Sequence, residues 1–187
     1  MSSRNAAVIP GVSTPAVHAR FGLKGPDAPA LLEHLGLRIP ALPNRVTHWH
    51  VGEEFGSGRC LRQGSSEFLI ELDSNAPPVP LASALQPRAW TLIRADHSLL
   101  LDGSAWPQKL AQLCSFDFER LRSEPDLVVM TLMAGISVTL IREPQVAAPR
   151  AADMPLRLWC DAGFSTYLQD CLHSISLDAT PAPGEFR

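Results

Sequence analysis

Hydrophobic residues follow two periods along the chain, and the period changes at glycines and prolines. In the run EFLIELD, Phe68, Ile70 and Leu72 occupy alternate positions, which is typical of a strand with one buried face. Runs of the same kind predict further strands at residues 19–24, 46–51, 58–63, 89–96, 97–103, 126–133, 135–143 and 156–161. A tight turn at Ala134 and Gly135 is expected to join two of these strands into a hairpin.

The segment RFGLKGPDAPALLEHLG predicts a strand, a turn and a helix over residues 26–35. Glycines and a lysine before a helix are features of an anion site, but neither phosphate-binding spacing, GxxxxGK[ST] nor GxGxxG, is present. We therefore expect Gly25 to make the turn, Pro26 to occupy the first helical position and Asp27 to complement the helix dipole. Gly36 is expected to end the helix.

Two further helices are predicted in the second half of the chain. Trp106, Leu110 and Leu113 lie on one face of a helix for which Ser104 is the expected N-cap. The apolar stripe of a last helix consists of Phe164, Leu168, Cys171 or Leu172, and Ile175.

Each half of the chain gives a strand, a glycine turn, a helix and then strands of alternating character, which is a faint internal repeat. This order predicts an α+β protein of two related subdomains, each an antiparallel sheet with helices. We expect a flexible N-terminus over residues 1–16, a first subdomain over 17–76, a second over 77–176 and a flexible C-terminus over 177–187.

Composition narrows the class of protein. A chain of 187 residues that is 45% hydrophobic and 19% charged can bury a substantial core. Its formal net charge of -3 lacks the basic excess that nucleic-acid binding needs. No apolar run approaches a membrane span, and the N-terminal residues lack the apolar centre of a signal peptide. We expect a cytoplasmic protein with no membrane or nucleic-acid partner.

Cysteines and histidines are the first candidates for chemistry. Cys60, Cys114, Cys160 and Cys171 form no CxxC pair and are expected to be small core residues. No pair of residues suggests general acid and base catalysis, and we assign no catalytic residue.

His48 and His50 lie two positions apart in a predicted strand, so both imidazoles project from one face and could share a zinc ion. Further ligands would have to come from Glu53, Glu54 or His34. Because nothing in the spacing requires a third ligand, we expect a polar strand face rather than a metal site.

Trp159 alternates with Leu158 and Cys160, so it faces outward with Arg157 if its neighbours face the core. A large aromatic residue beside an arginine is typical of an interface anchor. Trp159, Arg157 and Trp49 are therefore the candidate interface residues. The alternative is that Trp159 packs in the core of a sheet that is covered on both faces.

Five segments follow one another in a characteristic order: RFGLKGPDAPALLEHLGLRIPALPN, GRCLRQGSSEFLIELD, LLLDGSAWPQKLAQLCSFDFERL, VTLIRE and LRLWCDAGFSTYLQDCL. Together, over about residues 19–175, they resemble the gamma subunit of heterotetrameric sarcosine oxidase. That family is related to the folate-binding fold of the glycine-cleavage T-protein and the aminomethyltransferases, and similar small subunits occur in N-methylglutamate dehydrogenase. The resemblance implies a fold like the N-terminal part of the T-protein.

The resemblance also implies a function. It predicts a noncatalytic accessory subunit, bound to the large alpha subunit of a flavoenzyme that oxidatively demethylates an N-methyl amino acid such as sarcosine and passes the one-carbon unit to tetrahydrofolate. FAD, FMN, NAD, tetrahydrofolate and zinc are then held by the partner subunits, and no catalytic, cofactor-binding or metal residue is carried over to this chain. The alternative is a stand-alone folate or small-ligand binding protein related to aminomethyltransferases.

Overall fold

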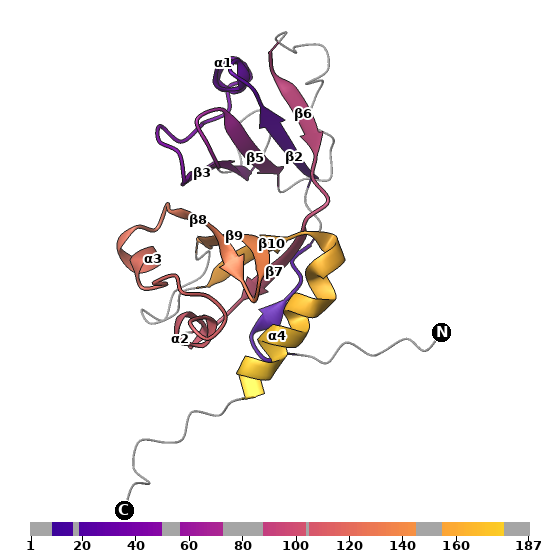
Figure 1. Ribbon diagram of the computed structural model, residues 1–187. Coiled ribbons are helices and arrows are strands. Elements are labelled where there is room, and N and C mark those ends of the chain that lie inside the picture. The colour runs from indigo at the N-terminus through magenta and orange to yellow at the C-terminus, as the bar shows by residue number, and fades with distance from the viewer. Residues whose placement is uncertain are drawn as a thin grey trace, which may run out of the picture.

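Two five-stranded antiparallel sheets form the framework of the protein in a computed structural model, which describes residues 9–16, 19–49, 57–72, 88–103, 105–144 and 155–177 (Figure 1). The first sheet has the strand order β3-β4-β5-β2-β6 and the second the order β1-β7-β10-β9-β8. The strands of the first sheet are β2 (Ala19–Lys24), β3 (Arg45–Trp49), β4 (Gly58–Arg62), β5 (Glu67–Leu72) and β6 (Trp90–Ile93). Those of the second are β1 (Val12–Ser13), β7 (His97–Leu101), β8 (Val128–Met133), β9 (Ile136–Arg142) and β10 (Leu156–Cys160).

The architecture confirms the predicted α+β class, and each predicted strand is present. The hairpin turn between β8 and β9 is also confirmed, because Ala134 and Gly135 both have positive φ, at 50° and 83°. Several expectations lie outside the described residues: His50, Glu53, Glu54, residues 1–8 and residues 178–187. The expected Ser104 N-cap is wrong, because the N-cap of the helix that begins at Trp106 is Ala105.

Each sheet takes one edge strand from the part of the chain that otherwise builds the other sheet. β1 pairs with β7 in the second sheet, where Val12 lies opposite Leu101. β6 pairs with β2 in the first sheet, where Trp90 lies opposite Lys24. The predicted boundary between residues 76 and 77 is therefore wrong as a division between the two sheets, because pairing between distant strands leaves no signal in local periodicity.

The predicted flexible N-terminus is wrong from Ile9 onward. Ile9 is buried in the core of the second sheet, and Val12 and Ser13 pair with β7 as strand β1. The small, polar and proline-containing sequence of this segment predicts little regular structure. Two of its residues, Val12 and Ser13, nevertheless pair at the edge of the second sheet.

The outer face of the first sheet packs against α1 (Ala28–His34). Leu31 and Leu32 of the helix join Phe68 and Ile70 of β5 in one buried cluster. The helix ends as predicted at Gly36, whose φ is 73°. Its amide bonds the carbonyl of Glu33, as in a Schellman motif.

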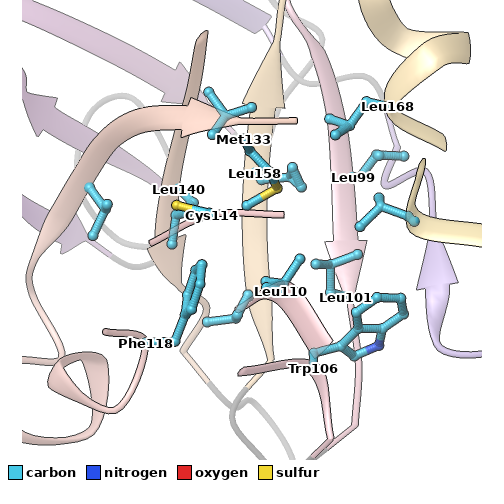
Figure 2. Packing of buried hydrophobic residues seen from close by; sticks show 14 of the residues in the cluster. Leu99, Leu101, Trp106, Leu110, Cys114, Phe118, Met133, Leu140, Leu158 and Leu168 are labelled. Carbon is cyan, nitrogen blue, oxygen red and sulfur yellow. The ribbon is translucent and has the colours of Figure 1, made fainter. Parts of the chain in front are cut away.

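The outer face of the second sheet packs against α2 (Trp106–Leu110), α3 (Arg120–Ser123) and α4 (Ser165–Leu177), and a short 3-10 helix η1 (Ala162–Phe164) precedes α4. Figure 2 shows side chains from α2, α4 and the strands gathered in one cluster, with Leu168 and Trp106 at its rim. Leu168, Leu172 and Ile175 form the predicted stripe. The assignment of Phe164 to that stripe is wrong. Phe164 belongs to η1, before α4 begins, and is 52% exposed. None of the described helices has the length and apolar content that crossing a bilayer requires.

The inner faces of the two sheets pack on each other, with α1 on one outer side and α2, α3 and α4 on the other (Figure 1). Six buried residues of both sheets make this inner cluster: Val46, Leu61, Leu69, Val128, Ile141 and Trp159. At one corner the backbones bond directly, because the amide of Val46 donates to Asp126 and the amide of Val128 donates to Asn44. The sheets therefore form one unit with three layers of buried side chains.

The turn before α1 differs in detail from its prediction. The helix begins at Ala28, so Pro26 lies in the turn and Asp27 is the N-cap. The Asp27 carboxylate makes no capping hydrogen bond but accepts two from the guanidinium of Arg88, at 2.8 and 3.2 Å. Gly25 has a φ of 131°, and a Cβ there would lie 2.1 Å from the carbonyl oxygen of Arg88.

We expect Gly25→Val to lower the free energy of unfolding by about 1 to 3 kcal/mol, because a β-branched residue is strained at this φ and collides with the Arg88 carbonyl. Urea unfolding measures the loss. Gly64→Val is the matched control, since the nearest atom to a Cβ there is the Cβ of Glu67 at 3.6 Å, an ordinary contact distance; it should cost less than about 0.5 kcal/mol. Equal losses in the two variants would contradict the role given to Gly25.

Candidate functional site

The most distinctive polar feature is a cluster of charged side chains buried between the sheets. Its centre is Glu71 of β5, whose side chain is 0% exposed. Register places Arg59 of β4 and Arg20 of β2 on either side of Glu71, on the same inner face. Arg20 reaches the Glu71 carboxylate at 2.8 Å through Nη2 and 2.9 Å through Nε, and Arg59 Nε lies 3.4 Å from it.

The second sheet completes the cluster from the opposite side. Arg157 Nη1 of β10 donates to Glu71 Oε1 at 3.1 Å, and the indole Nε1 of Trp159 donates to Oε2 at 3.0 Å. Glu143, just after β9, accepts from Arg157 at 2.8 and 3.2 Å and from Arg59 at 2.6 Å. We call Arg20, Arg59, Glu71, Glu143, Arg157 and Trp159 the Glu71 cluster. Its hydrogen bonds join the two sheets.

The arginines keep both carboxylates ionised. Burial by itself would raise the pKa of Glu71, but the guanidinium groups of Arg59, Arg20 and Arg157 hold this pKa below its ordinary value of 4.5. The pKa of Glu143 is lowered in the same way, against burial, by Arg59 and Arg157. A general acid needs a raised pKa near the working pH, so these two carboxylates are suited to holding the sheets together and not to proton transfer.

The structure corrects the candidate interface residues. Trp159, Arg157 and Trp49 are 1%, 5% and 1% exposed, so none of them is on the surface of this chain. Trp159 and Arg157 face away from the helices, as the alternation required, but the first sheet covers that face. Trp49 packs in the α1 core, against Gly58. The alternative interpretation of Trp159, core packing in a sheet covered on both faces, is the correct one.

Of the histidine pair, His48 is among the described residues and His50 is not. His48 lies half-buried on β3 and lines a cavity of about 380 Å³ together with Asp126 and Glu143. His34, proposed as a further ligand, is exposed in the last turn of α1. Within the part of the chain that the structure describes, no three His, Cys, Asp or Glu side chains are grouped as a metal site would need.

Three cysteines are core residues, as predicted. Cys60, Cys114 and Cys160 are buried, whereas Cys171 is half-buried on α4. Burial raises the pKa of Cys60 to about 12, and burial together with the Asp161 carboxylate raises the pKa of Cys160. A nucleophilic cysteine needs the thiolate, so neither environment suits catalysis.

The Lys24 side chain pairs with Glu67, at 3.1 Å, in an exposed ion pair across β2 and β5. A lysine in a phosphate-binding turn would be directed at the ligand, so the contact agrees with the turn-only interpretation of this segment.

A cavity of about 540 Å³ lies beside the Glu71 cluster on the inner face of the second sheet. We call it the β8 cavity; its walls include Met130, Leu132, Thr139 and Trp159, with Arg94 and Asp96 from the connection between β6 and β7. Arg94 and Asp96 pair with each other at 2.8 and 3.2 Å.

Sequence reasoning missed the residues that centre this site. Alternation in EFLIELD places Glu71 on the face opposite to Phe68, Ile70 and Leu72, which the sequence predicts to be solvated, and no pattern gives Arg20, Arg59 or Glu143 a role. One signal was present: Leu69 lies on the same face as Glu71, and a large apolar residue on a face supposed to be solvated indicates that the face is covered.

Comparison with known proteins first defines the class of fold. The two sheets and their helices match the crystal structure of glycine cleavage system aminomethyltransferase T from Bartonella henselae, with a TM-score of 0.59 and 12% identity over 87% of this chain. This chain spans 45% of the length of that protein.

A second solved structure matches over most of both chains. It is the heterotetrameric sarcosine oxidase from Corynebacterium sp. U-96 in complex with pyrrole 2-carboxylate, with a TM-score of 0.70 and 23% identity over 88% of this chain and 82% of the other. No protein-family model matches the sequence, and no curated protein matches it at the level of sequence. The fold is therefore shared with these proteins.

We expect Glu71→Gln to lower the free energy of unfolding at pH 7 by about 3 to 5 kcal/mol, because it leaves buried guanidinium groups without their shared carboxylate. A lowered folded-state pKa contributes stability that is complete above the unfolded pKa and is lost as the pH falls through the folded value. The difference between wild type and variant should therefore shrink below about pH 4.5. Urea unfolding at pH 7 and in mild acid measures both effects.

Glu67→Gln on the same strand is the matched control for Glu71→Gln. Glu67 and its partner Lys24 are 38% and 56% exposed, so this pair contributes less than about 1 kcal/mol. A difference for Glu71→Gln that is independent of pH would contradict the role of the ionised carboxylate.

Proposed function

We propose that the chain is a noncatalytic accessory subunit of a sarcosine-oxidase-like complex. One observation carries the proposal: the fold match to a chain of a heterotetrameric sarcosine oxidase extends over 88% of this chain and 82% of the other. The match to the aminomethyltransferase, by contrast, spans less than half of that protein. A chain that matches nearly the whole of one polypeptide of a multichain enzyme is suited to the place of that polypeptide.

In the proposed complex the other subunits supply the chemistry. They oxidatively demethylate an N-methyl amino acid such as sarcosine and pass the one-carbon unit to tetrahydrofolate, and they hold FAD, FMN, NAD, tetrahydrofolate and zinc. The described titratable groups of this chain support such a division. Glu71 and Glu143 are ionised and engaged by arginines, and the pKa of Cys60 is about 12. The role of this chain is to dock on the large alpha subunit.

A second candidate function is a stand-alone folate or small-ligand binding protein. The β8 cavity favours it, because about 540 Å³ is within the range of small-molecule sites and its wall combines apolar side chains with Thr139 and Ser137. Titration of the free chain with tetrahydrofolate, followed by calorimetry, separates the two candidates. Binding at micromolar concentration would favour the second function.

We expect the chain to co-purify with the large subunit of a sarcosine-oxidase-like enzyme from the same organism when the two are co-expressed, and to elute with it in size-exclusion chromatography. Addition of this chain should increase the stability of the large subunit without changing its flavin spectrum. The large subunit of an unrelated flavoenzyme is the control. Separate elution at micromolar concentrations of both chains would contradict the proposed function.

We also expect the isolated chain to purify colourless and without stoichiometric zinc, because the proposal assigns every cofactor to the partners. Absorbance and elemental analysis test this. One zinc ion per chain that is lost in His48→Ala would contradict it and would support the histidine pair as ligands.

A further inference from the structure

β8 presents large apolar side chains on its inner face. Val128, Met130 and Leu132 share this face, while Val129 and Met133 point into the helix-side core. Val128 is 2% exposed because the first sheet covers it, but Met130 and Leu132 are 48% and 62% exposed. The inner face of this edge strand is therefore covered at its start and bare towards its end.

The β8 cavity continues this bare surface into the molecule. Met130 and Leu132 form part of its wall, and Trp159 of the Glu71 cluster lies at its inner side. Arg94 pairs with Asp96, and the Asp161 carboxylate adds one negative charge to the polar side of the cavity. Gln63 links two residues of the wall, since its side-chain nitrogen donates to Thr139 Oγ1 at 3.3 Å and its side-chain oxygen accepts from Arg94.

Aromatic side chains extend the surface at the end of the sheet. Phe164 and Tyr167 are 52% and 50% exposed, and the Tyr167 hydroxyl donates to the carbonyl of Ala134 in the turn between β8 and β9 at 3.0 Å. Asp161, which begins the η1 turn, also lines the β8 cavity. We call Met130, Leu132, Phe164, Tyr167 and the β8 cavity the β8 surface.

The size of the β8 surface indicates an interface. Four large side chains that are each about half exposed present roughly 400 Å² of apolar area, taking about 200 Å² for each. This area is within the range of the largest apolar patches on monomers, which often mark interaction sites, about 300–600 Å². It also amounts to about half of the roughly 800 Å² that each partner contributes to a standard interface.

We infer that the β8 surface is the docking site for an apolar segment of the large partner subunit, an assignment that rests on the proposed function. Methionine and aromatic side chains are enriched at interfaces, and charged residues are depleted at their centres. The cavity fits a segment without acidic side chains, because Arg94 is already paired with Asp96 and the Asp161 carboxylate adds a negative charge to the wall. The binding of an anion there would require breaking the Arg94 pair.

Leu132→Asp tests the site in the full chain, because it places a charge on the bare strand face without removing a buried side chain. Ile93→Asp is the matched control: Ile93 is 96% exposed, lies on the edge strand of the first sheet and is on the face opposite to Leu92. Phe164→Asp is a second test variant, outside the strand. Thermal unfolding establishes that each variant folds, and calorimetry with the purified large subunit measures the dissociation constant.

Leu132→Asp and Phe164→Asp should weaken binding of the large subunit at least tenfold, with Ile93→Asp within about twofold of wild type. If wild type binds and both test variants bind equally well, or if the control loses as much, the assignment of this surface is wrong while the proposed function stands. If wild type itself does not bind the large subunit, both fail. A wild-type homodimer that Leu132→Asp converts to monomers would identify a second copy as the occupant and would overturn the inference.

Discussion

The Glu71 carboxylate is the contact on which the relation between the two sheets depends. It accepts hydrogen bonds from Arg20 of its own sheet and from Arg157 and Trp159 of the other. Desolvating a carboxylate costs several kcal/mol unless its acceptor positions are filled, so the two sheets must meet in the one alignment that brings these donors together. The apolar cluster between the sheets stabilises their contact without fixing one alignment, because the hydrophobic effect is non-directional. The ionic contacts favour the observed alignment.

The same constraint accounts for what the inner faces expose. Side chains of both sheets are buried around the cluster and at the corner where Val46 and Asn44 bond to the start of β8. Away from that corner the first sheet does not cover the inner face of the second, and Met130 and Leu132 remain exposed. The exposed part belongs to the layer that is elsewhere the interior of the protein, which explains its apolar character.

Local pattern was sufficient for much of the fold. Alternation located the strands, and the glycines at 36 and 135 ended a helix and closed a hairpin where their positive φ was needed. The same alternation failed for Trp159, because it shows that two faces differ but not that the second face is covered. The pairing of β1 and β6 and the Glu71 cluster could not be predicted, since both join residues distant in sequence whose contacts leave no local period.

The exchange of edge strands has a consequence for synthesis on the ribosome. The first sheet lacks its edge strand until β6 has emerged from the ribosome. The N-terminal strand β1 has no pairing partner until β7 has emerged. Neither half of the chain can therefore complete its sheet alone, although each has its own helix-side core. Such long-range pairing slows folding, because the entropy of closing large loops is lost before the contacts form. The nascent chain thus exposes unpaired strand edges for much of its translation, and this is the interval in which chaperones would act on it.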